Sequence, residues 1–112
     1  MSPFARETLD DIRGHFGGYA TFKELCEWYG ASDAVMRDAI KQLLAAGKLW
    51  QVDRKLTTNR PRLGRARSLL ARGCSLDFAA KAIGMRADEL DLALWRDLHN
   101  RALAKQNVRR AA

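Results

Sequence analysis

Residue types that build metal sites are scarce in this sequence of 112 residues. Its two cysteines, Cys26 and Cys74, lie 48 positions apart and form no CxxC pair, which argues against a zinc site. Its two histidines, His15 and His99, add no closely spaced pair of ligands. We therefore expect no bound metal, and we interpret both cysteines as small buried apolar residues.

Long apolar runs and catalytic motifs are also missing. No segment has the roughly 20 apolar residues that a membrane-spanning helix needs, and residues 1–10 have no apolar signal core. The length allows one domain or two very small ones, and it excludes a barrel or a doubly wound nucleotide-binding enzyme. There is no paired-carboxylate motif, phosphate loop or nucleophile elbow. We expect a cytoplasmic protein that contacts no membrane, binds no cofactor and is not an enzyme.

Acidic residues are absent from one long segment of the chain. The net charge is +7, but residues 1–50 sum to −1 and residues 51–112 sum to +8. Residues 54–72 hold seven cations and no acid. Either a solvated, flexible linker or a segment that contacts the phosphates of a nucleic acid would explain such a block. The complete absence of acids favours the second interpretation.

Helical periodicity dominates the first half of the chain. The expected elements are helices over residues 4–16, 21–30 and 32–47, and a β ribbon of residues 49–52 with a return strand at 57–58. Thr21 and Glu24 form a capping box at the start of the second helix. The third helix is expected to bury an apolar face that includes Val35 and Met36.

A short helix, a glycine turn and a longer helix make up the helix-turn-helix arrangement. Cys26 lies four residues before Gly30, where a close helix crossing needs a small side chain, and Met36 lies six residues after it, where an apolar residue is needed. With the β ribbon added, residues 4–58 resemble a winged helix-turn-helix domain of the kind found in many bacterial transcription regulators. The resemblance implies DNA binding by this unit.

The second half repeats the pattern of the first. Its expected helices cover residues 63–72, 75–83 and 86–104. When Gly84 is aligned with Gly30, the two halves superpose at an offset of 54 residues, and the capping residue Thr21 falls on Ser75. We therefore predict an all-α fold with a short β wing, built from tandem helix-turn-helix units. The predicted divisions are a winged unit over 1–58, a second three-helix unit over 59–104 and a basic tail over 105–112 that frays unless DNA is present.

The second unit begins with the arm Asn59-Arg60-Pro61-Arg62. An Arg-Pro-Arg arm ahead of three helices resembles the DNA-binding domain of the invertase and resolvase recombinases, over residues 59–104. In that family the arm lies in the minor groove, so the resemblance implies that Arg60 and Arg62 are minor-groove residues. The sequence contains no recombinase catalytic domain, so the resemblance implies DNA binding and not strand cleavage.

Ten residues make up the predicted DNA-binding set. They are Ser32, Arg37 and Lys41 of the first unit, Arg54, Lys55, Arg60, Arg62, Arg65 and Arg67 of the basic segment, and Arg86 of the second unit. The tip of the second recognition helix is acidic, because Asp88, Glu89 and Asp91 follow one another there. These acids would repel a phosphate backbone within a Debye length of about 8 Å. A protein partner for one of the two units is therefore a competing interpretation.

Two of the three tryptophans have positions that favour packing over base stacking. Trp50 begins the β ribbon, and Trp95 adjoins Leu98 on a helix, so we expect both to lie in a core or between the units. An alternative for Trp95 is a helix-helix contact with a second copy of the chain, shared with Leu98, Ala102 and Leu103.

The sequence thus predicts a protein that binds double-stranded DNA sequence-specifically and regulates transcription in a bacterium or phage. Two alternatives stay open. One is a protein-interaction module that binds RNA polymerase, a nuclease or another regulator, and the other is a phage DNA-packaging subunit. A homodimer is a possible partner state for the regulator, whereas a packaging subunit would need a ring-forming oligomer.

Overall fold

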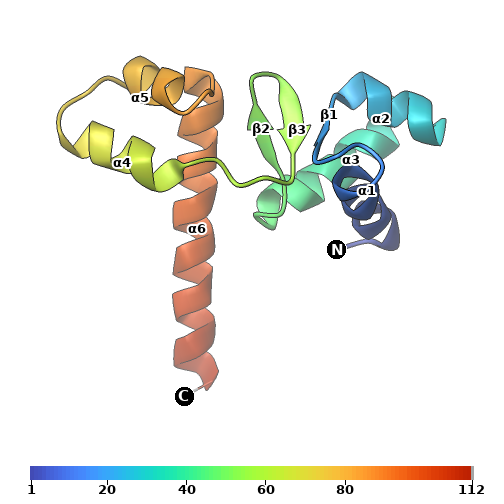
Figure 1. The fold of residues 1–112 in the computed structure, drawn as a ribbon. Coiled ribbons are helices and arrows are strands. Elements are labelled where there is room, and N and C mark those ends of the chain that lie inside the picture. The colour runs from blue at the N-terminus through green and yellow to red at the C-terminus, as the bar shows by residue number, and fades with distance from the viewer. Residues whose placement is uncertain (112) are drawn as a thin grey trace.

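A computed structural model of the chain describes the backbone of residues 1–111 and the side chains of residues 1–106. Within these residues the fold is mostly helical and has one small antiparallel sheet, as the sequence predicts (Figure 1). The helices are α1 (Pro3–Arg13), α2 (Phe22–Tyr29), α3 (Asp33–Ala45), α4 (Leu63–Ala71), α5 (Leu76–Ala82) and α6 (Ala87–Ala111). The strands are β1 (Tyr19–Ala20), β2 (Trp50–Val52) and β3 (Lys55–Thr57).

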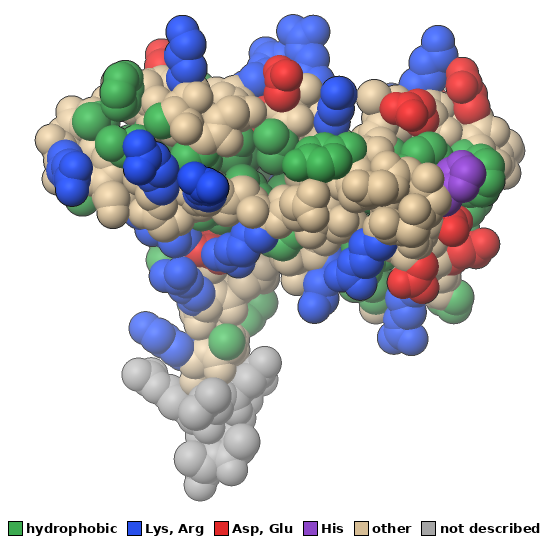
Figure 2. Space-filling view, in the orientation of Figure 1, with side chains coloured by type: hydrophobic (Ala, Val, Ile, Leu, Met, Phe, Trp, Pro, Cys, Tyr) green, Lys and Arg blue, Asp and Glu red, His purple; other side chains and the backbone are tan. Residues whose placement is uncertain are grey.

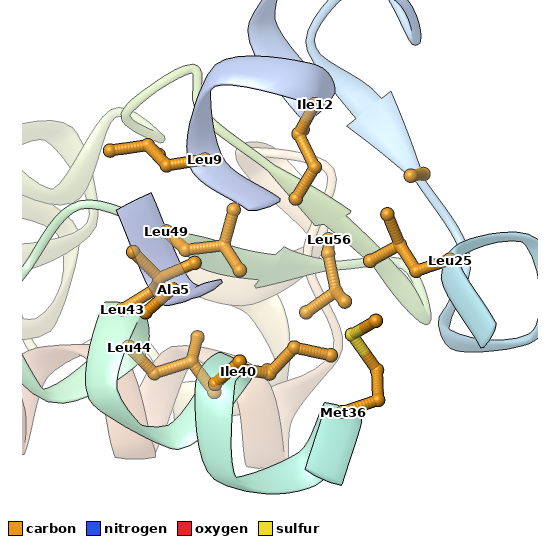
Figure 3. Packing of buried hydrophobic residues seen from close by; sticks show 12 residues of the cluster. Ala5, Leu9, Ile12, Leu25, Met36, Ile40, Leu43, Leu44, Leu49 and Leu56 are labelled. Atoms are coloured by element: carbon orange, nitrogen blue, oxygen red, sulfur yellow. The ribbon is translucent and has the colours of Figure 1, made fainter. Parts of the chain in front are cut away.

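The first three helices and the sheet enclose one buried apolar cluster (Figure 3). Its fully buried side chains include Ile12 of α1, Leu25 of α2, Met36 of α3 and Leu49 just before β2. Capping side chains set where the helices begin, because their oxygens accept backbone N–H groups that lack a partner within the helix. Ser2, Thr21 and Ser32 cap α1, α2 and α3 in this way.

The sheet has the order β1-β3-β2, and both pairings are antiparallel. The β ribbon was expected, but its return strand starts at Lys55 and not at Thr57. The strand β1 was not expected, because two residues between Gly18 and Thr21 carry no detectable alternation. It pairs with β3 through Tyr19 opposite Thr57, and so attaches the loop after α1 to the ribbon.

The second half has its own buried cluster, to which α4, α5 and α6 contribute. The sequence offset of 54 residues recurs in the helix boundaries. Helices α2 and α5 begin at Phe22 and Leu76, α3 and α6 begin at Asp33 and Ala87, and Ser75 caps α5 as Thr21 caps α2. The anchors Met36 and Leu90 are both fully buried. Trp50 and Val52 of β2 pack against the second cluster, so the ribbon contacts both halves.

Several expectations about helix length and burial are wrong, including the burial of Cys26 and Cys74, which are both only half-buried. Helix α1 ends at Arg13 and not at residue 16, because the chain turns through Gly17 and Gly18, which both have positive φ. Val35 is 52% exposed, because it points away from the core face of α3. Trp95 is 63% exposed, because it lies on the face of α6 opposite the buried Leu90.

Helix α6 continues past the predicted end at residue 104. It runs to Ala111 and so passes through most of the predicted basic tail. The side chains of Arg109 and Arg110 lie outside the described residues. In Figure 1 the C-terminal half of α6 projects below the rest of the molecule, with no other element beside it.

A single carboxylate connects the ribbon to the start of α6. Glu89 is only 8% exposed, and its Oε1 accepts hydrogen bonds from the backbone N–H groups of Asp53 and Arg86, each at 2.8 Å. Its Oε2 accepts the N–H of Arg54 at 2.8 Å. These three bonds compensate for removing the carboxylate from water. Glu89 therefore joins the two halves and cannot belong to an exposed acidic tip, as the sequence had suggested.

Replacing Glu89 with glutamine tests this connection. We expect Glu89→Gln to lower the free energy of unfolding by about 2 kcal/mol, because the new NH2 group cannot accept one of the buried N–H groups. The measurement is urea denaturation followed by circular dichroism. Asp88→Asn is the matched control, since Asp88 is exposed, and it should change stability by less than about 0.5 kcal/mol. Equal losses in the two variants would contradict the structural role of Glu89.

Candidate nucleic-acid interface

A groove of about 370 Å³ lies between α3, the β2–β3 ribbon and α6. Four of its nine lining residues are cations, and the other five are uncharged. The cations are Arg37 and Lys41 of α3, Arg54 of the ribbon and Arg96 of α6. No acid is among the described residues that line the groove. An apolar and amide floor with unopposed cations around it is suited to a polyanion.

Helix α3 contributes two of these cations from adjacent turns. Arg37 and Lys41 are four residues apart, so they project from the same side of the helix, and both are exposed. The Arg37 guanidinium carbon lies 5.7 Å from the centre of the Phe22 ring, which orients that side chain along α2. Ser32, also in the predicted set, caps α3, and its hydroxyl accepts the N–H of Val35 at 3.4 Å.

Arg54 occupies a position that glycine would normally fill. The two-residue turn between β2 and β3 has positive φ at Asp53 (51°) and Arg54 (66°), the pattern of a type I′ turn. Asn or Asp followed by Gly is favoured in such turns, so a bulky side chain at the second position costs conformational energy. The Glu89 carboxylate holds the N–H of Arg54 and keeps the turn in place. The arginine is thus maintained at the groove by a contact from α6.

Arg96 is the groove residue that sequence reasoning did not find. It lies three residues after the buried Ala93 on α6, on the flank of the buried face, and is half-buried. Burial lowers the pKa of its guanidinium, which still remains charged at neutral pH. In the sequence, Arg96 lies 42 positions from Arg54 and outside the basic segment. The one signal that could have placed it near the groove is its spacing of three residues from Ala93, which puts both on neighbouring faces of the helix.

The segment 54–72 contains no acid, but α6 supplies one to it. Arg60 Nη2 lies 3.1 Å from Asp97 Oδ1, Arg67 Nη2 bonds the other carboxylate oxygen, and Arg101 Nε lies 3.4 Å from that same oxygen. Asp97 is only 13% exposed. The Arg60 guanidinium also lies 6.0 Å from the centre of the Trp50 ring. Two cations of the predicted DNA-binding set therefore hold the linker against α6.

Burial, together with the neighbouring Arg101 and Arg60, lowers the pKa of Arg67. The remaining cations of the predicted set are exposed and lie outside the groove. Lys55 begins β3, Arg62 immediately precedes α4 and Arg65 lies on α4. Arg86 precedes α6 and its Nε lies 3.5 Å from Asp88 Oδ1. The structure thus brings Arg37, Lys41 and Arg54 together and leaves the others apart.

The surface charge follows the same division. Figure 2 shows the acidic side chains mainly over the α1 and α2 side of the molecule, while Lys and Arg side chains predominate around α4. The asymmetry between residues 1–50 and 51–112 is therefore also an asymmetry of the surface in this view.

No family model matches the chain, and neither a curated protein nor a solved structure matches it. None of the described helices combines the length and the apolar character that crossing a bilayer requires. The described residues also contain no group of three His, Cys, Asp or Glu side chains placed to hold a metal ion. The geometry of the basic groove is therefore the basis for a functional assignment.

The two arginines of α4 allow a test of the role of Asp97. We expect Arg67→Ala to lower the free energy of unfolding by about 1–2 kcal/mol, because it removes a charge-assisted bond to a largely buried carboxylate. Arg65→Ala removes the same charge from an exposed position on the same helix and should cost less than about 0.5 kcal/mol. Thermal or urea unfolding of the two variants gives the comparison. A matching loss in Arg65→Ala would mean that net charge, and not the Asp97 contact, is responsible.

Proposed function

We propose that this chain binds double-stranded DNA through the basic groove and acts as a sequence-specific regulator of transcription. In this proposal α2, the turn at Gly30 and α3 form a helix-turn-helix, and the β2–β3 ribbon is its wing. The observation that carries the proposal is the gathering of four cations around one groove with no acid in its lining. Phosphate neutralisation by such cations supplies most of the affinity of DNA-binding proteins.

The exposed side of α3 would enter the major groove. It presents Ala34 and Asp38, and the exposed Val35 adds an apolar group that can contact a thymine methyl. Arg37, Lys41, Arg54 and Arg96 would then contact the phosphates on the wing side of the helix. A recognition helix between phosphate contacts is the docking arrangement of helix-turn-helix proteins in general.

The second helix pair, α5 and α6, is less suited to reading bases. The first turn of α6 carries Asp88 and Glu89, of which Glu89 is internal, and Arg86 is partly neutralised by Asp88. We assign this unit a supporting role, in which Arg62 and Arg65 contact phosphates beside the groove. Arg60 is already paired with Asp97, so we do not assign it to the minor groove.

The protein-interaction alternative loses part of its support for the same reason. It relied on the three acids Asp88, Glu89 and Asp91 at the tip of α6, of which Glu89 is buried and Asp88 contacts Arg86. An exposed Asp91 alone is not an acidic docking face.

Removing the groove cations provides the main test of DNA binding. We expect the double variant Arg37→Ala/Lys41→Ala to lower duplex affinity and to reduce the slope of log affinity against log salt by about 2, one for each lost phosphate contact. Arg54→Gly should reduce the slope by about 1 while leaving stability equal or slightly higher, because glycine suits the positive φ. Fluorescence anisotropy with a labelled duplex at several salt concentrations measures both effects.

The matched control removes two cations from another face. Arg6 and Arg13 are exposed on α1 and do not line the groove, so Arg6→Ala/Arg13→Ala should leave the slope nearly unchanged. If the slope falls equally in this control, binding depends on the net charge of the chain and not on the groove cations. No duplex binding by the wild-type chain at low salt would overturn the proposal. Selection of bound sequences from a random duplex pool tests sequence specificity, and an unenriched pool would limit the function to non-specific binding.

A further inference from the structure

Helix α6 exposes an apolar stripe that nothing in the described part of the chain covers. Trp95 is 63% exposed and Leu98 69%, and Leu92 and Leu103 are also exposed. The buried residues of α6 lie on the opposite side, where Leu90 and Ala93 enter the second apolar cluster. Exposed large apolar residues occur singly on most proteins, whereas a row of them along one helix face marks an interaction surface.

The spacing of the stripe is that of a coiled coil. Leu92, Trp95, His99, Ala102 and Gln106 recur at alternating intervals of three and four, which are the a and d positions of a heptad, and the exposed Leu98 and Leu103 flank them. The rings of Trp95 and His99 are stacked with their centres 5.4 Å apart and their planes 3° from parallel, so the two side chains form one aromatic cluster on this face. Leu98 lies at the edge of this seam, at a position equivalent to g.

The exposed part of α6 is also too isolated to be stabilised by its own fold. All side chains from Arg101 to Gln106 are exposed, and this part projects beyond the other elements (Figure 1). A short helical segment without tertiary contacts is only marginally stable in water. The apolar face of such a helix is normally packed against another element.

The charges beside the stripe select its partner. Asp88 and Asp91 lie at the N-terminal end, whereas Lys105 lies at the C-terminal end. A second copy in antiparallel orientation would place Asp91 of each chain against Lys105 of the other, so that acid faces base at both ends of the contact. One antiparallel register puts Leu98 against Leu98 of the second copy, Trp95 against its His99 and Asp91 against its Lys105. This contact is isologous, so it closes after two chains.

We propose that α6 is the dimerisation helix of this protein, pairing antiparallel with α6 of a second copy through the Leu92, Trp95, His99 and Ala102 stripe. The proposal rests on the stripe and its flanking charges, and it does not depend on DNA binding.

Sedimentation equilibrium of the full chain in the absence of DNA tests the contact. The wild-type protein should be a dimer, and Trp95→Glu should raise its dissociation constant by about a hundredfold, because each dimer loses two central aromatic contacts. Circular dichroism should show that the fold is retained, with at most a loss of helical signal from the projecting end of α6, since Trp95 is largely exposed in the single chain. Phe78→Glu is the control: Phe78 is an equally exposed apolar residue on α5, outside the stripe, and its loss should leave the dimer intact. A monomer or a larger closed ring in the wild type, or equal effects of the two variants, would overturn the proposal.

A charge exchange tests the orientation. Asp91→Lys and Lys105→Asp should each weaken the dimer, and the double variant should restore it, because each exchanged residue again faces the opposite charge. Failure of the double variant to recover, when the single variants are weakened, would overturn the antiparallel arrangement. If a monomeric Trp95→Glu variant still binds duplex DNA, the dimer contact and the proposed DNA site are independent of each other.

Discussion

The Glu89 carboxylate is the contact on which the arrangement of the molecule depends. It accepts three backbone N–H groups, two from the β2–β3 turn and one from the start of α6. A buried carboxylate without such partners would be strongly destabilising, so the turn and the helix stay in place together or are lost together. The basic groove has α3, the ribbon and α6 as its walls, so its shape depends on this connection together with the packing of Trp50 and Val52 against the second apolar cluster.

A second acid on the same helix has a related role. Asp97 binds Arg60, which precedes α4, and Arg67 of α4, so two residues of the basic segment are used to hold that part of the second unit against α6. Of the predicted DNA-binding cations, Arg37, Lys41 and Arg54 line the groove, while Lys55, Arg62, Arg65 and Arg86 are exposed outside it. Helix α6 thus supplies acids to the interior and a cation, Arg96, to the groove. The net charge of +7 is a poor guide to the interface, because part of it stabilises the fold.

Local signals predicted the helices, but they did not reveal the site. The caps Thr21 and Ser75 and the turn glycines are read directly from the sequence, because their effects act over a few residues. Arg54 and Arg96 meet at the groove only through tertiary packing, and a local sequence pattern carries no information about such packing. Glu89 was read as an exposed acid because glutamate seldom lies buried, and its partners are backbone groups that every sequence has. The exposure of Trp95 depends on whether a partner is present, which the pattern of one helix does not specify.

The two faces of α6 connect the groove with the proposed dimer. Its inner face carries Glu89, which holds the ribbon, and Asp97, which holds the linker, while the apolar stripe lies on the outer face. Arg96 lies between the two, on the edge that borders the groove. A dimer formed through the stripe would relate its two grooves by a two-fold axis and fix their separation through one rigid helix. Two identical sites with a fixed separation favour inverted half-sites in DNA, so the outer face of α6 would determine which half-site spacing the groove residues can reach together.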